Sequence, residues 1–303
     1  MIRQTPSRAG LPRLFCALAL VVVAASGFGR AAQERPLPEL ETFLAAARTR
    51  LQTDNERQRS YIYVETQRTR KLDGSGKTRS ESVKVVESYP PLPGENERWE
   101  RVLEADGKKK TEAELARQDA DRRKTAEGVA RRLSSPDQAD QARAAQSRDR
   151  DRREALQRID DIFIVYEVKM VGRERIDGRD TIELTLDPRP DARPVTREGK
   201  WMQAFKCRAW VSEADHELVK LNADAIRDLN IGFGMLARMN TGTQMSFVRR
   251  WVDGEVWLPA RADYTIRARV LMLKRYDQGG TIEFSSYRKF TVDTSTTIAP
   301  PTQ

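Results

Sequence analysis

The sequence has few of the residues that disulfides and metal sites require. It contains two cysteines and one histidine in 303 residues. Cys16 lies in an apolar N-terminal segment, and removal of that segment leaves Cys207 as the only thiol. An intramolecular disulfide and a cysteine-based metal site are then excluded, and one histidine cannot form the two-histidine helix of a zinc protease. We expect no metal and no cofactor.

Common catalytic motifs are also missing. The sequence has no Gly-x-Ser-x-Gly nucleophile turn and no complete Gly-x-x-x-x-Gly-Lys-Ser/Thr phosphate loop. Asp73-Gly74-Ser75-Gly76 has the glycines of such a loop, but strand-like segments flank it, which predicts a hairpin turn. Among the carboxylates, Asp160-Asp161 forms no recognisable acid–base pair, and Glu65 and Glu183 fall in alternating strands where outward, solvated side chains are expected.

Cys207 and His216 are the one pair that could act as nucleophile and base. Cys207 alternates in phase with Phe205 and Val211, so it is predicted to face an apolar core. His216 lies in the polar segment Ser212–Glu217, which we interpret as the exposed tip of a hairpin about 20–30 Å away. We therefore predict no catalytic residue, and we expect that the chain is not an enzyme.

The sequence lacks an excess of one charge in any long segment. Its 54 basic and 45 acidic residues are interleaved, with a formal net charge of +9, so no basic stripe stands out. Residues 108–158 are about half charged and contain no aromatic residue. This segment is interpreted either as a basic arm for nucleic acid or as a pair of solvated helices, in part disordered. The mixed signs favour the helices, and we expect no nucleic-acid partner.

No hydrophobic run is long enough to span a membrane comfortably. Three arginines precede the apolar run Leu14–Val23, and the small residues Ala24–Gly27 follow it. This order is typical of a secretory signal peptide. We predict that residues 1–31 are that signal, with cleavage between about residues 26 and 32. The protein is expected to be periplasmic or secreted, and peripheral at most to a membrane.

Alternating apolar and polar residues dominate the rest of the chain. Helical spacing over Leu37–Arg59 places Leu40, Phe43, Leu44, Ala47 and Leu51 on one face. From Ile159 onward the period is two, which predicts an antiparallel sheet with one wet face. A Pro-rich surface loop is expected at 187–200. The expected strands are Phe163–Arg173, Asp180–Asp187, Phe205–Val211, Leu218–Ile226, Thr243–Val252, Arg261–Lys274 and Thr281–Phe290, with turns at Asp177-Gly178, Asp253-Gly254 and Gln278-Gly279-Gly280.

The stretch Leu229–Met239 is apolar, rich in methionine and contains two glycines. It is interpreted either as a short helix or loop that plugs the core of the sheet, or as a mobile apolar flap beside a ligand cavity. Together with the apolar faces of two strands it supplies the candidate cavity residues, which are Ile231, Phe233, Met235, Leu236, Met239, Leu184, Leu186, Phe205 and Val211.

Three segments resemble the outer-membrane lipoprotein-sorting (LolA/LolB-like) superfamily. They are YIYVETQRTRKLDGSGKTRSES from Tyr61, RAWVSEADHELVKL from Arg208 and FVRRWVDGEVWLPARADYTIRA from Phe247. The resemblance implies a mainly β protein with helices: an open antiparallel half β-barrel wrapped over helices, with an apolar concave face. One domain would cover 37–290, with a charged helical insertion at 108–158 and a disordered tail at 291–303.

The resemblance also implies function. Carriers of this superfamily bind the acyl chains of lipoproteins, and relatives regulate envelope stress. We expect an exported, non-enzymatic binding protein that holds a lipid or an acylated protein on the concave face. An alternative is an interaction or regulatory module that docks an envelope protein through residues 108–158. A third hypothesis is an uncharacterised hydrolase whose chemistry the motifs miss.

Overall fold

The alternating segments form one antiparallel sheet in the computed structural model, which describes residues 35–92, 95, 97–134, 138–231, 237–270 and 274–290. The predicted signal at 1–31 and tail at 291–303 lie outside these residues and stay predictions. Hydrogen-bonded strands follow the order β4-β3-β2-β1-β13-β12-β11-β8-β7-β6-β5, and β10 pairs with β12 and β9. The strands are β1 Tyr61–Leu72, β2 Thr78–Tyr89, β3 Trp99–Ala105, β4 Lys108–Lys109, β5 Tyr166–Ile176, β6 Arg179–Pro188, β7 Phe205–Ser212, β8 Leu218–Ala225, β9 Leu229–Ile231, β10 Ala237–Met239, β11 Gln244–Val252, β12 Val256–Val270 and β13 Lys274–Lys289.

The sheet is open. Strands β4 and β5 are the two ends of the order, and no pairing between them occurs within the described ranges. Four helices accompany the sheet in the same ranges: α1 Leu40–Gln58, α2 Glu112–Leu133, α3 Gln138–Val165 and α4 Arg197–Met202. The predicted fold class, an antiparallel open half-barrel packed on helices with a charged helical insertion, is confirmed.

Two predicted boundaries near helices are wrong. The strand predicted to begin at Phe163 begins at Tyr166, because Phe163 lies in the last turn of α3. Apolar residues continue across this junction without a break. The change from helical spacing to strand alternation therefore cannot be detected in so short a run. The loop predicted at 187–200 also contains the start of α4, which begins after its N-cap residue Thr196.

The turn predicted at Gln278-Gly279-Gly280 is wrong as well. These residues lie inside β13, and β12 ends at Val270, so Lys274 belongs to β13 rather than to β12. Gly280 lies opposite Tyr264, and a Cβ at Gly280 would lie 2.5 Å from the ring carbon Cε1 of that tyrosine. The glycine is needed for the close approach of the ring and does not reverse the chain.

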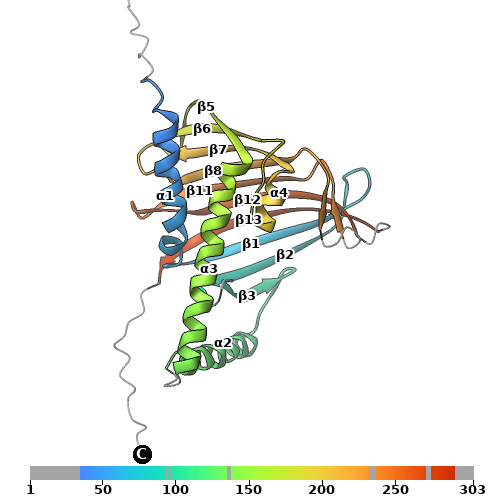
Figure 1. Cartoon of the computed structure of the whole chain (residues 1–303). Helices are drawn as coiled ribbons and strands as arrows, with labels where there is room; N and C mark the ends of the chain where they lie inside the picture. The colour runs from blue at the N-terminus through green and yellow to red at the C-terminus, as the bar shows by residue number, and fades with distance from the viewer. Residues whose placement is uncertain are drawn as a thin grey trace, which may run out of the picture. The chain divides into compact units, whose positions relative to one another are not determined.

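The segment 108–158 connects the two edges of the sheet. It forms α2 and most of α3, between the edge strand β4 and the opposite edge strand β5. Ten strand spacings of about 4.8 Å amount to about 48 Å along the sheet, and the 28 residues of α3 span about 42 Å. Figure 1 shows α3 running across the face of the sheet, on the same side as α1. The charged segment is therefore a crossover connection that the topology requires.

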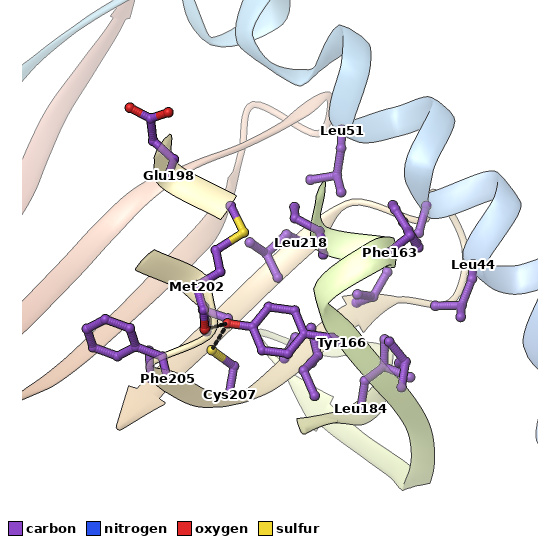
Figure 2. Close-up of a pocket in the computed structure, with 18 of the residues that line it drawn as sticks. Leu44, Leu51, Phe163, Tyr166, Leu184, Glu198, Met202, Phe205, Cys207 and Leu218 are labelled. Atoms are coloured by element: carbon purple, nitrogen blue, oxygen red, sulfur yellow. Dashed lines mark hydrogen bonds between the residues drawn. The ribbon is translucent and has the colours of Figure 1, made fainter. Parts of the chain in front are cut away.

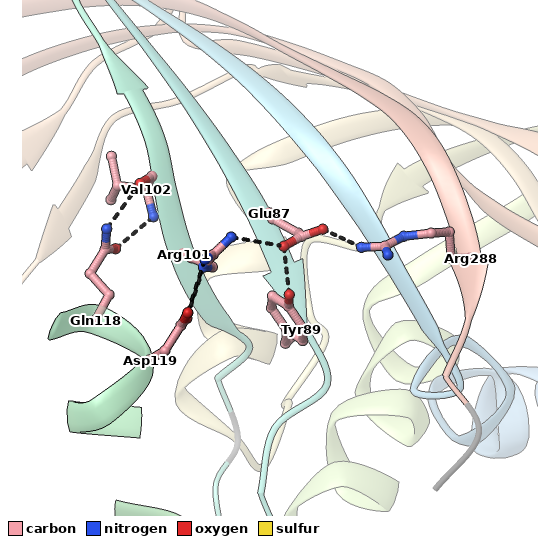
Figure 3. A network of polar contacts seen from close by, with 7 residues as sticks. All are labelled: Glu87, Tyr89, Arg101, Val102, Gln118, Asp119 and Arg288. Carbon is pink, nitrogen blue, oxygen red and sulfur yellow. Dashed lines mark hydrogen bonds and ion pairs between the residues drawn. The ribbon is translucent and has the colours of Figure 1, made fainter. Parts of the chain in front are cut away.

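Helix α2 is fastened to the edge strand β3. The side-chain amide of Gln118 accepts a hydrogen bond from the backbone N–H of Val102 at 2.8 Å and donates one to its carbonyl at 3.0 Å. At the next residue of α2, Arg101 donates two hydrogen bonds to the carboxylate of Asp119 at 2.8 and 2.9 Å. Figure 3 shows this network. Gln118 thus takes the place of a neighbouring strand at Val102 and covers an edge that would otherwise be open.

The main core lies between the helices and strands β5–β8. Phe43 and Ala47 of α1 pack against Val165 at the end of α3 and against the inner faces of the strands. A smaller cluster of Tyr61, Val252, Val256 and Leu258 fills the other part of the sheet. None of the helices in the described part of the chain is long and apolar enough to cross a membrane.

Candidate functional site

Strand register places apolar side chains in rows on one face of the sheet. Leu186, Cys207 and Ala223 lie directly opposite one another on β6, β7 and β8, and Leu184, Ala209 and Leu221 form the next such row. Because alternate residues of a strand point to the same face, both rows face the helices. This face is the floor of an apolar cavity.

Helices form the other walls of this cavity, which has a volume of about 380 Å³. The size falls in the usual range of small-ligand sites. Figure 2 shows side chains from α1, α3 and α4 converging over the strands. The lining residues are Leu44, Ala47 and Leu51 of α1, Ile162 and Phe163 of α3, Glu198, Trp201 and Met202 of α4, and Tyr166, Val168, Leu184, Leu186, Phe205, Cys207, Ala209, Val211, His216, Leu218, Leu221, Ala223 and Met245 of the strands and their turns.

Asp161 positions α4 at the wall of the cavity. Its side chain is fully buried and accepts hydrogen bonds from the backbone N–H groups of Val195 at 2.8 Å and Thr196 at 2.7 Å, and from the Thr196 hydroxyl at 2.5 Å. Burial opposes ionisation, but these hydrogen bonds outweigh it and lower the pKa of Asp161. The carboxylate is thereby used in holding α3 to the segment that leads into α4.

Gly199 allows α4 to lie close to Asp161 of α3. A Cβ at position 199 would lie 2.6 Å from Cγ of Asp161 and 2.7 Å from Cβ of Pro194. Such distances are shorter than any ordinary carbon contact, so a larger residue would push α4 away from α3. Position 199 therefore needs glycine for space.

Tyr166 and Cys207 are the polar pair on the cavity floor. The Tyr166 hydroxyl donates a hydrogen bond to the carbonyl of Met202 at 2.9 Å and lies 3.5 Å from Sγ of Cys207 (Figure 2). Burial raises the pKa of Cys207, partly offset by the hydrogen bond with Tyr166, and burial also raises the pKa of Tyr166. Both groups are neutral at physiological pH. A protonated, buried thiol is a small apolar group rather than a nucleophile.

His216 is not the exposed tip that the sequence predicted. It does lie in the turn between β7 and β8, but it is half-buried and lines the same cavity as Cys207. Its ring centroid lies 5.1 Å from that of Phe43 on α1, and its backbone has a φ of +60°. The left-handed backbone turns the chain at the end of the hairpin, and α1 covers the ring. Figure 2 shows the other polar residue of the lining, Glu198, with its carboxylate directed away from the apolar side chains.

The structure places four of the nine predicted cavity residues in the lining: Leu184, Leu186, Phe205 and Val211. Met239 packs against the main core without lining the cavity. Phe233, Met235 and Leu236 lie outside the described residues, and only the backbone of Ile231 is described, as the end of β9. The flap and plug interpretations of Leu229–Met239 both stay predictions.

Sequence reasoning missed the part of the lining that α3 and α4 supply. The face of α1 was visible from its spacing, and Leu44, Ala47 and Leu51 of that face all line the cavity. Trp201 and Met202 gave no signal, because α4 has only six residues and was hidden in a Pro-rich segment. Ile162 and Phe163 were assigned to a strand or its approach rather than to a covering helix.

Polar residues around the cavity have structural partners. Arg57 at the end of α1 forms an ion pair with the buried Glu217 and donates to the backbone carbonyl of Glu255. Glu65, predicted to be solvated, is only 8% exposed, since it lies on the central strand β1 between Val86 and Phe284.

In the described part of the chain, no group of three or more His, Cys, Asp or Glu residues could hold a metal ion.

Comparisons with known proteins concern the fold. No protein-family model and no curated protein sequence matches this chain. Among solved structures, a domain assigned to outer membrane lipoprotein-sorting proteins from Vibrio parahaemolyticus matches 84% of this chain and 94% of its own length, at 10% identity and a TM-score of 0.33. A LolA superfamily protein from Nitrosomonas europaea matches 84% and 94%, at 11% identity and a TM-score of 0.27. A chain of the Pseudomonas aeruginosa MucA/MucB complex matches 82% and 98%, at 11% identity and a TM-score of 0.20. The chain thus resembles LolA superfamily and outer membrane lipoprotein-sorting structures, the resemblance that its three short segments predicted.

Proposed function

We propose that this protein binds the acyl chain of a lipid or of an acylated protein in the cavity between the sheet and helices α1, α3 and α4. The observation that supports this proposal is the chemistry of the walls. The floor is made of apolar strand residues, and its two polar side chains, Tyr166 and Cys207, are neutral and in contact with each other. This floor offers no charge for a headgroup and favours hydrocarbon, and the carboxylate of Glu198 in the wall is directed away from it.

Burial of hydrocarbon supplies the affinity in this proposal. Each methylene removed from water contributes about 0.8 kcal/mol, so an acyl chain needs no polar contact inside the cavity. The headgroup, or the protein that carries the acyl chain, would stay outside. The protein would act as a binding protein and not as an enzyme, since the thiol is protonated and the nearby carboxylates Asp161 and Glu217 hold the fold together.

Filling the cavity tests the proposal. Ala209 is buried on the floor, and Ala209→Phe would place a ring in the space that the acyl chain needs. We expect this variant to lose uptake of a fluorescent fatty acid while its melting temperature stays near that of the wild type. Ala130→Phe, on the exposed surface of α2, is the matched control for added apolar area and should bind normally. Full uptake by Ala209→Phe would contradict the proposal.

A further inference from the structure

Two rows of polar side chains cross the middle of the sheet on the face opposite the cavity. Ala223 of β8 lines the cavity, so its neighbours Asn222 and Asp224 point to the other face, because successive residues of a strand alternate. Strand register continues both residues across β11 and β12, which Figure 1 shows beside β8 in the sheet. The first row is Asp224, Gln244 and Thr265, and the second row is Asn222, Ser246 and Asp263.

The space between the two rows is a groove with a volume of about 330 Å³, which we call the polar trough. Met245, Tyr264 and Gly280 lie opposite one another between the rows. The side chains of Met245 and Tyr264 point to the cavity face by alternation, so these residues contribute backbone to the floor of the trough. The volume lies within the usual range of small-ligand sites.

A glycine and an arginine shape one end of the polar trough. Gly279 of β13 lies between Thr265 of β12 and Arg70 of β1, so the first row has no side chain there. Beyond this gap, Arg70 lines the trough, and its Nε has no hydrogen-bond partner among the described residues. Buried donors are rarely left without a partner. The arrangement therefore favours a ligand that accepts hydrogen bonds from this guanidinium.

Hydrogen bonds within the rows fix the direction of the other polar groups. The side-chain amide of Gln244 donates to Asp224 at 2.7 Å, and the hydroxyl of Ser246 donates to the side-chain carbonyl of Asn222 at 2.9 Å. These bonds leave Oε1 of Gln244 as an acceptor and Nδ2 of Asn222 as a donor, neither of them used within the described ranges. The hydroxyl of Thr265, also without a partner there, can both donate and accept.

The charges of the polar trough are balanced. Asp224 contributes a negative charge and Arg70 a positive one. The second carboxylate, Asp263, accepts two hydrogen bonds from Arg261 at 2.6 and 2.8 Å and is thereby neutralised. A simple anion would be repelled by Asp224 and a simple cation by Arg70. The trough thus suits a neutral ligand that both donates and accepts hydrogen bonds.

We propose that the polar trough binds the ring of a neutral sugar. Each hydroxyl of a sugar donates one hydrogen bond and accepts others, so consecutive hydroxyls match a row in which donors and acceptors alternate. A site that is built to bond hydroxyls discriminates strongly against compounds that lack them. The cavity on the opposite face has apolar walls, so the two sites take different chemical classes, and the sugar proposal does not depend on the acyl-chain proposal.

Removal of one hydroxyl from the polar trough tests the proposal. Titration of the full chain with glucose, galactose and mannose in turn should shift the side-chain amide signals of Asn222 and Gln244 in heteronuclear NMR spectra, with saturation for at least one sugar. Thr265→Val keeps a β-branched side chain in the strand, so its melting temperature should stay near that of the wild type. Its affinity for that sugar should fall about 3- to 10-fold, the effect of one neutral hydrogen bond.

Thr185→Val on β6 is the matched control. Thr185 is half-buried like Thr265, and it points away from the cavity because its neighbours Leu184 and Leu186 line it. Four strand spacings of about 4.8 Å separate β6 from β12, or about 19 Å. The same loss of a hydroxyl should therefore leave sugar affinity unchanged.

The outcomes separate the proposal from its rivals. No saturable shift with any of the three sugars would overturn it, as would equal affinities of Thr265→Val and Thr185→Val. Shifts produced by sodium phosphate but by no sugar would assign the trough to an anion instead. The trisaccharide of the bound sugar distinguishes two sources, since tighter binding indicates a glycan chain and weaker binding a free sugar. Fatty-acid uptake should be normal in Thr265→Val, so failure here is distinguishable from failure of the cavity proposal.

Discussion

The hydroxyl oxygen of Tyr166 lies 3.5 Å from Sγ of Cys207 and donates its proton to the backbone carbonyl of Met202. This chain of contacts joins the first residue of β5 to β7 and to the end of α4, so three walls of the cavity meet at one point. Burial at this point keeps Cys207, the only cysteine among the described residues, protonated and out of solvent.

Cys207 is expected to react slowly in the folded protein. Burial raises its pKa, with the contact to Tyr166 acting in the opposite sense, and only the thiolate attacks thiol reagents. In a Cys16→Ser background, where Cys207 is the single thiol, we expect a disulfide reagent to react at least about 100-fold faster in denaturant than in buffer. Equal rates in the two conditions would show that the strand face has been assigned wrongly.

Gly199→Ala should destabilise the protein by about 1–3 kcal/mol, because its methyl group would collide with Asp161 and Pro194. Urea denaturation measures this change. Gly128→Ala on α2 is the matched control, since nothing lies within 4 Å of its added Cβ. Alanine in a helix is favoured over glycine, so this control should be neutral or stabilised. The same effect in both variants would rule out the collision.

Asp161 should make the stability of the folded protein depend on pH in the acidic range. Its folded pKa is lowered, since the hydrogen bonds from Thr196 and Val195 outweigh the effect of burial. A carboxyl of this kind stabilises the fold above its unfolded pKa of about 3.9, and the contribution is lost as pH falls through the folded pKa. Asp161→Asn should cost about 1–3 kcal/mol at neutral pH. The difference from wild type should shrink below about pH 4; a difference that stays constant with pH would contradict this assignment.

Gln118→Leu should expose the edge of the sheet at β3. The variant removes both hydrogen bonds to Val102, which leaves the local pairing weaker by about 1–3 kcal/mol. We expect faster hydrogen exchange at the amide of Val102, measured residue by residue. Gln146→Leu, on the exposed surface of α3, should leave that amide unchanged. Unaltered protection in Gln118→Leu would mean that α2 does not guard this edge.

Local sequence patterns were sufficient to predict those features that depend only on residues close together in the chain. Period-two alternation alone predicted that Leu184, Leu186, Phe205 and Val211 share an inner face, and all four line the cavity. Helical spacing likewise marked the inner face of α1. These features need no knowledge of the rest of the chain, because the parity of a strand or the face of a helix follows from a few consecutive residues.

Features that depend on distant partners were missed. His216 is covered by Phe43, which is far away in the sequence. Glycine is required at position 280 because the ring of Tyr264 on the adjacent strand occupies the space of a side chain. The crossover role of 108–158 depends on which strands form the edges of the sheet. The local spacing of apolar residues does not determine the order of the strands. Whether this segment also docks an envelope protein stays a prediction.

The most direct test of the central claim is photo-crosslinking with a fatty acid that carries a diazirine at its methyl end. The account predicts crosslinks, located by mass spectrometry, on the cavity floor at Leu184, Leu186 or Cys207, and their loss in Ala209→Phe. Crosslinks confined to the exposed surface of α2 or to the outer face of the sheet, unchanged in Ala209→Phe, would contradict it.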